Sequence, residues 1–206
     1  MTGVSVRADT ARLGERLQYA TILWNSAECV VALVAGFLAG SIALVGFGFD
    51  SAIEVTSSVA AVWRLRSDRN EAVREAAERR TLRIIGACFL ALAVYVGYGA
   101  ARDLFTGEPP ARSLAGIIIA ALSLIVMPLL VRAKRRVAMK LRSGALEAEA
   151  RQTRVCALLS AILLLGLGAN AAFGWWWADP IAALAMLPVI AWEGWQAISG
   201  KTCCDD

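Results

Sequence analysis

The sequence contains no histidine in its 206 residues, and only 18% of them are Asp, Glu, Lys or Arg. Zinc hydrolases ordinarily hold their metal through histidine, and serine or cysteine nucleophiles ordinarily need a histidine base. The absence of histidine therefore argues against both reaction classes. We expect no catalytic residues, no catalytic cofactor and no enzymatic activity.

The sequence also lacks the marks of a secreted domain or a nucleic-acid-binding domain. It has five cysteines, of which Cys29, Cys88 and Cys156 lie in apolar stretches and Cys203 and Cys204 are adjacent. Such cysteines do not form a disulfide framework. The polar first sixteen residues are followed by no short apolar core with a cleavage site, so we expect no cleavable signal. The formal net charge of +4 comes from basic residues that flank apolar stretches, which argues against nucleic acid as a partner.

What the sequence does contain is apolar residues, which make up 58% of the chain and give a mean hydropathy of +0.59. They form six stretches of about 20 residues each, the length that crosses a bilayer as a helix. The sequence therefore predicts an all-α integral membrane protein, a single six-helix transmembrane bundle over residues 1–200 followed by a short cytosolic tail, 201–206. The predicted spans are residues 17–40, 42–63, 82–105, 114–131, 146–173 and 178–198.

Basic residues fix the expected orientation of this bundle. They gather in the first sixteen residues, in the connection after the second span, and in the connection after the fourth span, which includes Lys134. The opposite side has only Arg102 and Arg112. Because basic loops stay in the cytoplasm, we expect both termini to be cytoplasmic in a multi-pass protein of the cell (inner) membrane.

Asp50 and Glu54 lie in the middle of the second predicted span. Residues four apart share one face of a helix, and a carboxylate in hydrocarbon is costly unless it faces a polar path or an ion. Two hard oxygen donors on one face can bind a divalent cation. The alternative is that both acids pair with arginine or hydroxyl groups and only hold helices together.

Further candidate ligands lie in the first and fifth predicted spans. Glu28 should lie at a depth similar to that of Glu54, as a ligand, a proton carrier, a group that supports the ligands, or a hydrogen bond between helices. Glu149, Gln152 and Cys156 form one stripe of the fifth helix. An amide oxygen and a thiolate would complete four-coordination of a metal, although Cys156 can also be a small buried apolar residue.

Two other patterns have simpler interpretations. Gly36 and Gly40 form a GxxxG pattern, which favours close helix packing. Cys203, Cys204 and the two aspartates that follow them are either a metal-handling cluster or a tail without a role.

Arranged in this way, the chain resembles the cation diffusion facilitator family, over its first, second, fifth and sixth spans. The motifs that carry the resemblance are Gly40-Ser41-Ile42-Ala43-Leu44 before Asp50 and Glu54, the frame Ser143-Gly-Ala-Leu146-Glu-Ala-Glu149-Ala-Arg-Gln152-Thr-Arg-Val-Cys156, and Trp176-Trp177-Ala-Asp179-Pro180. In the family's pattern, aspartate stands where this chain has Glu54, histidine where it has Gln152, and aspartate where it has Cys156.

The resemblance implies a divalent metal exporter that works by alternating access in exchange for protons. Carried over by position, Asp50, Glu54, Gln152 and Cys156 form its metal site. A thiolate favours zinc, with Co, Cd, Ni, Fe or Mn as other ions. The resemblance also implies a homodimer, in a short variant without the family's C-terminal cytosolic domain. The alternative function is a non-transporting membrane partner that retains the fold.

Overall fold

The computed structural model describes residues 2–66, 71–107, 110–141 and 144–199. All regular structure in these residues is α-helical, and all six helices are long and apolar enough to cross a membrane. The prediction of an all-α, six-span membrane protein is therefore confirmed. The helices are α1 (Thr2–Ala39), α2 (Ile42–Arg66), α3 (Glu71–Thr106), α4 (Leu114–Leu141), α5 (Gly144–Phe173) and α6 (Ala178–Ser199).

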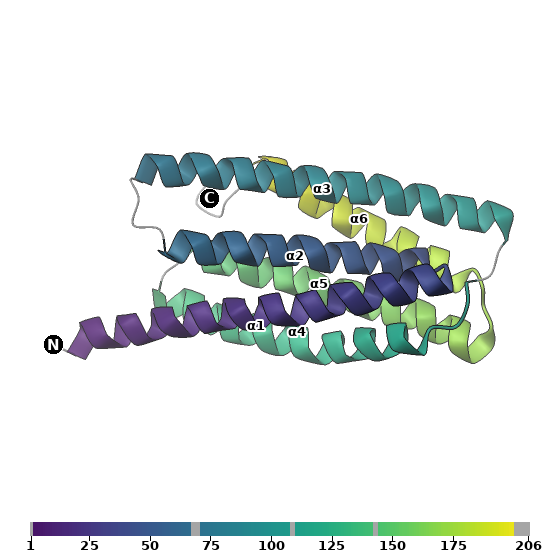
Figure 1. Cartoon of the computed structure of the whole chain (residues 1–206), viewed down its shortest axis with the longest axis horizontal. Helices are drawn as coiled ribbons and strands as arrows, with labels where there is room; N and C mark the ends of the chain where they lie inside the picture. Colours follow the sequence, from purple (N-terminus) through teal and green to yellow (C-terminus); the bar gives the residue numbers. More distant parts are fainter. Residues whose placement is uncertain (1, 67–70, 108–109, 142–143, 200–206) are drawn as a thin grey trace.

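The helices alternate in direction along one long axis (Figure 1). The end where α1 begins and α6 ends is called the termini side here, and the opposite end the far side. The helix α1 packs on α2 and α4, α3 packs on α6 and α2, and α5 packs on α4, α6 and α2. Of the six membrane segments, that of α2 is the most buried, at 67%. Its acidic residues therefore lie in the interior of the bundle.

Several helices extend beyond the predicted spans. The helix α1 begins at Thr2, α3 at Glu71, and α4 continues through Pro128 to Leu141. The connection after the second predicted span is helical from Glu71 onward, and residues 67–70 lie outside the described part of the chain. Helices that project past the hydrocarbon are compatible with membrane spans of ordinary length.

Glycines end three helices at the far side. Gly40, Gly107 and Gly174 directly follow α1, α3 and α5 and have φ values of 66°, 67° and 69°. A glycine at this position adopts the left-handed conformation without strain and so closes the helix. Gly40 thus serves a turn. A Cβ on Gly36, by contrast, would lie 2.8 Å from the Val45 side chain, so Gly36 is the member of the GxxxG pattern that permits close packing of α1 on α2.

The start of α6 is joined to the start of α2 by Asp179. Its Oδ1 accepts a hydrogen bond of 2.5 Å from Ser41 Oγ, and its Oδ2 accepts one of 3.4 Å from the Ala43 amide. Ser41 Oγ in turn accepts a hydrogen bond from the Leu44 amide. Free amides at a helix start and the helix dipole both favour a carboxylate there. The Trp-Trp-x-Asp-Pro motif therefore fixes two helices to each other at the far side.

Candidate metal site

Carboxyl groups from α1 and α2 come together in the interior of the bundle. Glu28 is 0% exposed, Asp50 3% and Glu54 2%. Asp50 and Glu54 lie one turn apart near the middle of α2 and interact electrostatically with each other. Both also interact electrostatically with Glu28. Carboxylates at this depth need a proton, a hydrogen-bond donor or a cation to offset their desolvation.

The carboxyl group of Glu28 is occupied by donors from four helices. Its Oε1 accepts a hydrogen bond of 2.6 Å from Ser51 Oγ and contacts Cys156 Sγ at 3.6 Å. Its Oε2 accepts hydrogen bonds from Ser123 Oγ at 2.5 Å and from Trp24 Nε1 at 2.8 Å. Of the roles considered for Glu28, this arrangement favours the one that holds helices together.

Asp50 and Glu54 have carboxylate oxygens that face no donor. The Oδ2 atom of Asp50 and the Oε2 atom of Glu54 are buried and have no hydrogen-bond partner. The other oxygen of Glu54 accepts a hydrogen bond of 2.8 Å from Thr153 Oγ1. A buried acceptor without a partner costs about 1–3 kcal/mol, and more when it is charged. A cation between these two oxygens would remove that cost.

Cys156 of α5 lies beside this pair. Its side chain is 1% exposed, its thiol donates to Glu28 Oε1 at 3.6 Å, and the carboxyl groups of Asp50 and Glu54 lie close enough to it to interact electrostatically. Asp50 therefore lies near α5. The structure thus places a thiol in the neighbourhood of two carboxyl groups with free oxygens.

Gln152 lies one turn nearer the termini side and shares a serine with Glu149. Ser57 Oγ is 2.7 Å from Glu149 Oε1 and 2.8 Å from Gln152 Oε1, but a hydroxyl has one proton to donate. The Gln152 Nε2 atom is buried and has no partner. Rotating the amide by half a turn lets Nε2 donate to Ser57 and Ser57 donate to Glu149. The amide oxygen of Gln152 is then the free atom, and it can serve as a ligand.

Glu149 is fully engaged with neighbouring helices. Besides Ser57, its carboxylate accepts a hydrogen bond of 3.4 Å from Ser58 Oγ and lies 3.6 Å from the ammonium Nζ of Lys134. Like the oxygens of Glu28, its carboxylate oxygens are occupied by donors from the protein. Asp50 and Glu54 thus keep free oxygens, whereas the oxygens of Glu28 and Glu149 are occupied.

The ligands do not form a finished metal centre in this conformation. Within residues 2–66, 71–107, 110–141 and 144–199, no three His, Cys, Asp or Glu side chains are grouped in a way that holds a metal ion. Glu28 and Glu149 do not add to such a group, because they are turned toward hydroxyl groups, an indole and an ammonium. The second candidate cluster, at Cys203 and Cys204, lies outside the described residues.

Sequence reasoning counted Lys134 among the basic residues of the connection after the fourth span and missed its burial. In the structure Lys134 belongs to α4 and is 1% exposed. The sequence feature that indicates the burial of Lys134 is the helical stripe that it shares with Ser123, Met127 and Val131, all of which are buried. A charged residue on the same stripe as an interior serine faces the interior.

Two amide side chains of α1 also lie in the interior of the bundle. Gln18 and Asn25 are 0% exposed, and none of their side-chain nitrogen and oxygen atoms has a hydrogen-bond partner. With Thr21 they share the face of Glu28 at helical spacing and lead from it toward the termini side. The interior is therefore polar between the acids and that end of the bundle.

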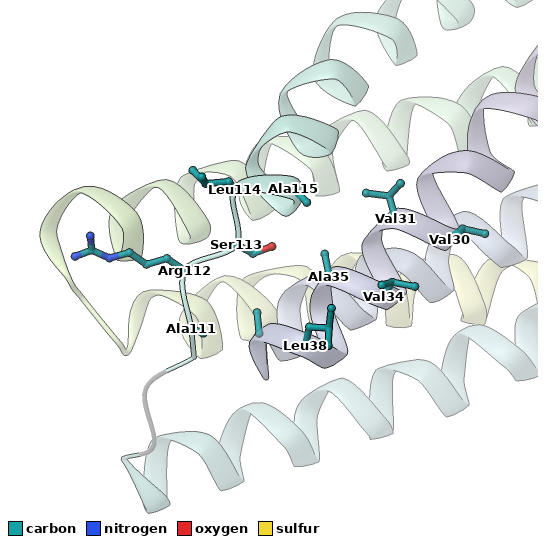
Figure 2. Close-up of a pocket in the computed structure, with 11 residues that line it drawn as sticks. Val30, Val31, Val34, Ala35, Leu38, Ala111, Arg112, Ser113, Leu114 and Ala115 are labelled. Atoms are coloured by element: carbon teal, nitrogen blue, oxygen red, sulfur yellow. The ribbon is translucent and has the colours of Figure 1, made fainter.

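A hollow of about 460 Å³ lies elsewhere, at the far side between α1 and the segment that enters α4 (Figure 2). Its lining is mostly apolar and includes Val30, Val34 and Leu38 of α1 and Leu114 of α4. Among the described residues, its lining contains no acidic residue. The hollow is distinct from the acidic site, and this described lining offers a cation neither a carboxylate nor a thiol.

Comparison with known proteins agrees with a membrane-spanning fold. Residues 19–200 match the family model described as the cation efflux transmembrane domain. The uncharacterized transporter sll1263 of Synechocystis sp. is 28% identical over 197 residues, which cover 90% of this chain and 62% of that protein. The chain therefore spans less than two thirds of the length of this relative.

Proposed function

Because the chain belongs to the cation efflux family, whose transmembrane-domain model its residues 19–200 match, we propose that it exports a divalent metal cation from the cell in exchange for protons. One observation carries this proposal. Two buried carboxylate oxygens without partners, on Asp50 and Glu54, lie beside a buried thiol in the middle of the bundle. Such atoms call for a ligand, so we propose transport and no catalytic reaction.

The donor set supports zinc as the transported ion. Asp50 and Glu54 supply hard oxygens, the Gln152 amide can supply another, and Cys156 supplies a soft sulfur. Oxygen ligands alone would favour manganese, iron or magnesium, whereas a thiolate shifts the preference toward zinc, cobalt or cadmium. Four such ligands match the coordination number of zinc in proteins. Cobalt, cadmium, nickel, iron and manganese are the competing ions.

Protons are the natural exchange partners because carboxylates are the only titratable oxygen ligands of this set. With no histidine in the chain, Asp50 and Glu54 would bind protons when the metal has left and release them when it returns. Either occupant offsets the desolvation of the two carboxylates. Alternating access would expose the site to one side of the membrane and then to the other. The unpartnered amides of Gln18 and Asn25 support a polar route from the termini side.

The direct test is proton-coupled zinc flux into proteoliposomes that contain the purified chain. We expect the wild type to take up zinc and, as it does so, to change the fluorescence of a pH-sensitive dye. We expect Asp50→Ala and Glu54→Ala to abolish both the zinc uptake and the dye signal. Glu147→Ala is the matched control, because Glu147 is an exposed carboxylate near the start of α5. Unchanged flux in both site variants would defeat the proposal.

A second candidate function is a membrane partner that keeps the fold but does not transport. It is favoured by one observation, that no finished three-ligand metal centre is present among the described residues. This function predicts that no metal binds in the membrane interior. Anomalous scattering from crystals soaked in zinc or cobalt would distinguish the two, since the exporter requires a peak between Asp50 and Cys156.

The proposed exporter lies in the cell (inner) membrane with both termini in the cytoplasm. Exposed basic side chains at the ends of α3 and α4 on the termini side support this orientation, namely Arg80, Arg83, Arg132, Arg135, Arg136 and Lys140. We also propose a homodimer formed through membrane helices, by analogy with the family. Cross-linking in native membranes tests the dimer, and accessibility of a tag at each terminus tests the orientation.

A further inference from the structure

Lys134 carries a positive charge into the interior of the bundle. Its side chain is 1% exposed, although its neighbours Arg132, Arg135 and Arg136 on the same helix are exposed. A buried ammonium is expensive unless charged and hydrogen-bonded partners surround it. The position of Lys134 thus requires a specific set of acceptors, and α5 provides them.

The contacts of Lys134 lead to the candidate metal ligands. Its Nζ donates a hydrogen bond of 2.9 Å to Thr153 Oγ1 and lies 3.6 Å from Glu149 Oε2. An ammonium can only donate, so it uses the Thr153 oxygen as an acceptor and leaves the Thr153 hydroxyl proton free. Two acceptors lie within reach of that proton, Glu54 Oε1 at 2.8 Å and the Glu149 backbone carbonyl at 3.0 Å, and the carboxylate is the closer and stronger one. One hydroxyl group therefore separates the ammonium from Glu54.

The charges of this region are unequal. Two buried carboxyl groups lie near the ammonium of Lys134, that of Glu149 at 3.6 Å and that of Glu54 on the other side of the Thr153 hydroxyl. Asp50 and Glu28 add two more buried carboxyl groups beside Glu54. A divalent cation at Glu54 would place two further positive charges close to the ammonium. In a medium of low dielectric constant, like charges at such separations repel strongly.

We propose that Lys134 is a tethered cation that competes with the transported divalent cation for the acidic site. This inference rests on the proposed function and deepens it. When the ion binds between Asp50 and Glu54, the ammonium withdraws along its flexible stem toward the termini side. When Lys134 returns to Thr153 and Glu149, it helps to expel the ion. Lys134 therefore weakens the binding of the transported ion and speeds its release.

Zinc binding to the purified full-length chain in detergent, measured by calorimetry, tests the competition. Lys134→Met removes the tethered charge and is expected to lower the Kd for zinc at least about tenfold, which corresponds to about 1.4 kcal/mol. Lys140→Met is the matched control because Lys140 is exposed on the same helix, and its Kd should equal that of the wild type. Lys134→Arg keeps the charge and should keep the wild-type Kd within about threefold.

Zinc flux gives an independent readout. In proteoliposomes, Lys134→Met is expected to lower both the KM for zinc and the maximal rate, because the ion binds more tightly and leaves more slowly. A residue that only supports the fold would instead weaken binding when it is removed. A Kd for Lys134→Met that is unchanged or raised, in protein that remains folded, would overturn the proposal.

Lys134→Met leaves Glu149 without its cation and can therefore fail to fold. For that case, the Kd for zinc of Glu149→Gln is compared with that of the double variant Lys134→Met/Glu149→Gln. The double variant leaves neither buried charge without its partner, because both charges are removed. The same tenfold fall in Kd is expected between these two, and its absence overturns the inference. If neither the wild type nor any variant binds zinc, the proposed function fails as well. If the wild type binds zinc and removing Lys134 changes nothing, only this inference fails.

Discussion

Glu28 and Asp50 are predicted to respond in opposite ways to the same chemical change. Each is a buried acid near the middle of its helix, but Glu28 accepts hydrogen bonds from Ser51, Ser123 and Trp24, whereas Asp50 keeps a free oxygen. Replacing each acid by its amide, as Glu28→Gln and Asp50→Asn, changes one oxygen atom into an NH2 group. The two variants therefore separate a residue that holds the fold from a residue that holds the ion.

The hydrogen bonds set the expected magnitudes. In Glu28→Gln the NH2 group is expected to face Ser51 and the thiol, because the Trp24 indole can only donate, whereas the Ser51 hydroxyl can accept from the amide and donate to the Phe47 carbonyl at 3.1 Å. The thiol then loses its acceptor, and the remaining donors keep a neutral acceptor in place of a charged one. At about 1–3 kcal/mol for one stranded group, the metal-free protein loses about 1–3 kcal/mol of stability. Asp50→Asn strands no donor at Oδ2 and removes a buried charge. Its metal-free stability should stay equal or rise by about 1–2 kcal/mol.

The assay is equilibrium unfolding in mixed detergent, with and without zinc. Zinc at 100 times its Kd should stabilise the wild type by about 2.7 kcal/mol. Glu28→Gln should retain most of this increment despite its lower starting stability, and Asp50→Asn should lose all of it. If Glu28→Gln removed the zinc effect without destabilising the protein, or if Asp50→Asn unfolded while zinc still stabilised it, the assignment of the two acids would be wrong.

Three further changes test the fold and the ligand set. Asp179→Ala should cost about 1–3 kcal/mol in the same unfolding assay, because the Ser41 hydroxyl and a helix-start amide lose their acceptor; an unchanged midpoint would contradict the capping role. Gly36→Ala should cost about 1–3 kcal/mol through overpacking, since its Cβ would lie 2.8 Å from a valine side chain, whereas Gly168→Ala meets nothing within 4 Å and should be tolerated. Cys156→Ser should reduce thermal stabilisation by zinc and cadmium more than that by manganese across a panel of divalent ions, because the soft ligand is lost; an equal loss for all ions would exclude a thiolate ligand.

The sequence predicted the fold well because the bilayer restricts the choices. Six apolar stretches of sufficient length allow little besides six helices, and the acids of α2 stood out because charge is rare in such stretches. Lys134 shows the limit of the same reasoning. Beside Arg132 and Arg135 it looked like one more basic residue near a membrane surface, and only its position on the buried stripe of α4 distinguishes it.

The division of labour among the acids could not be predicted from their spacing. Glu28 and Glu149 have the same chemistry as Asp50 and Glu54, yet their oxygens are taken by serine and lysine side chains from other helices and, for Glu28, also by Trp24 of its own helix. Which acid is satisfied depends on the rotation of each helix about its own axis. That rotation follows from tight contacts between helices, such as that of Gly48 in α2 with Leu33 in α1, and not from any local sequence pattern.

Asp179 at the far side and Glu149 near the termini side hold α2 through different partners, Ser41 at its start and Ser57 late in the helix. The two fastenings belong to different helices, α6 and α5, so releasing one does not release the other. If the chain works as the proposed exporter, a bundle held in this way would open at one end while the opposite end stays closed. The membrane would then remain closed to ions whenever only one of the two contacts is released.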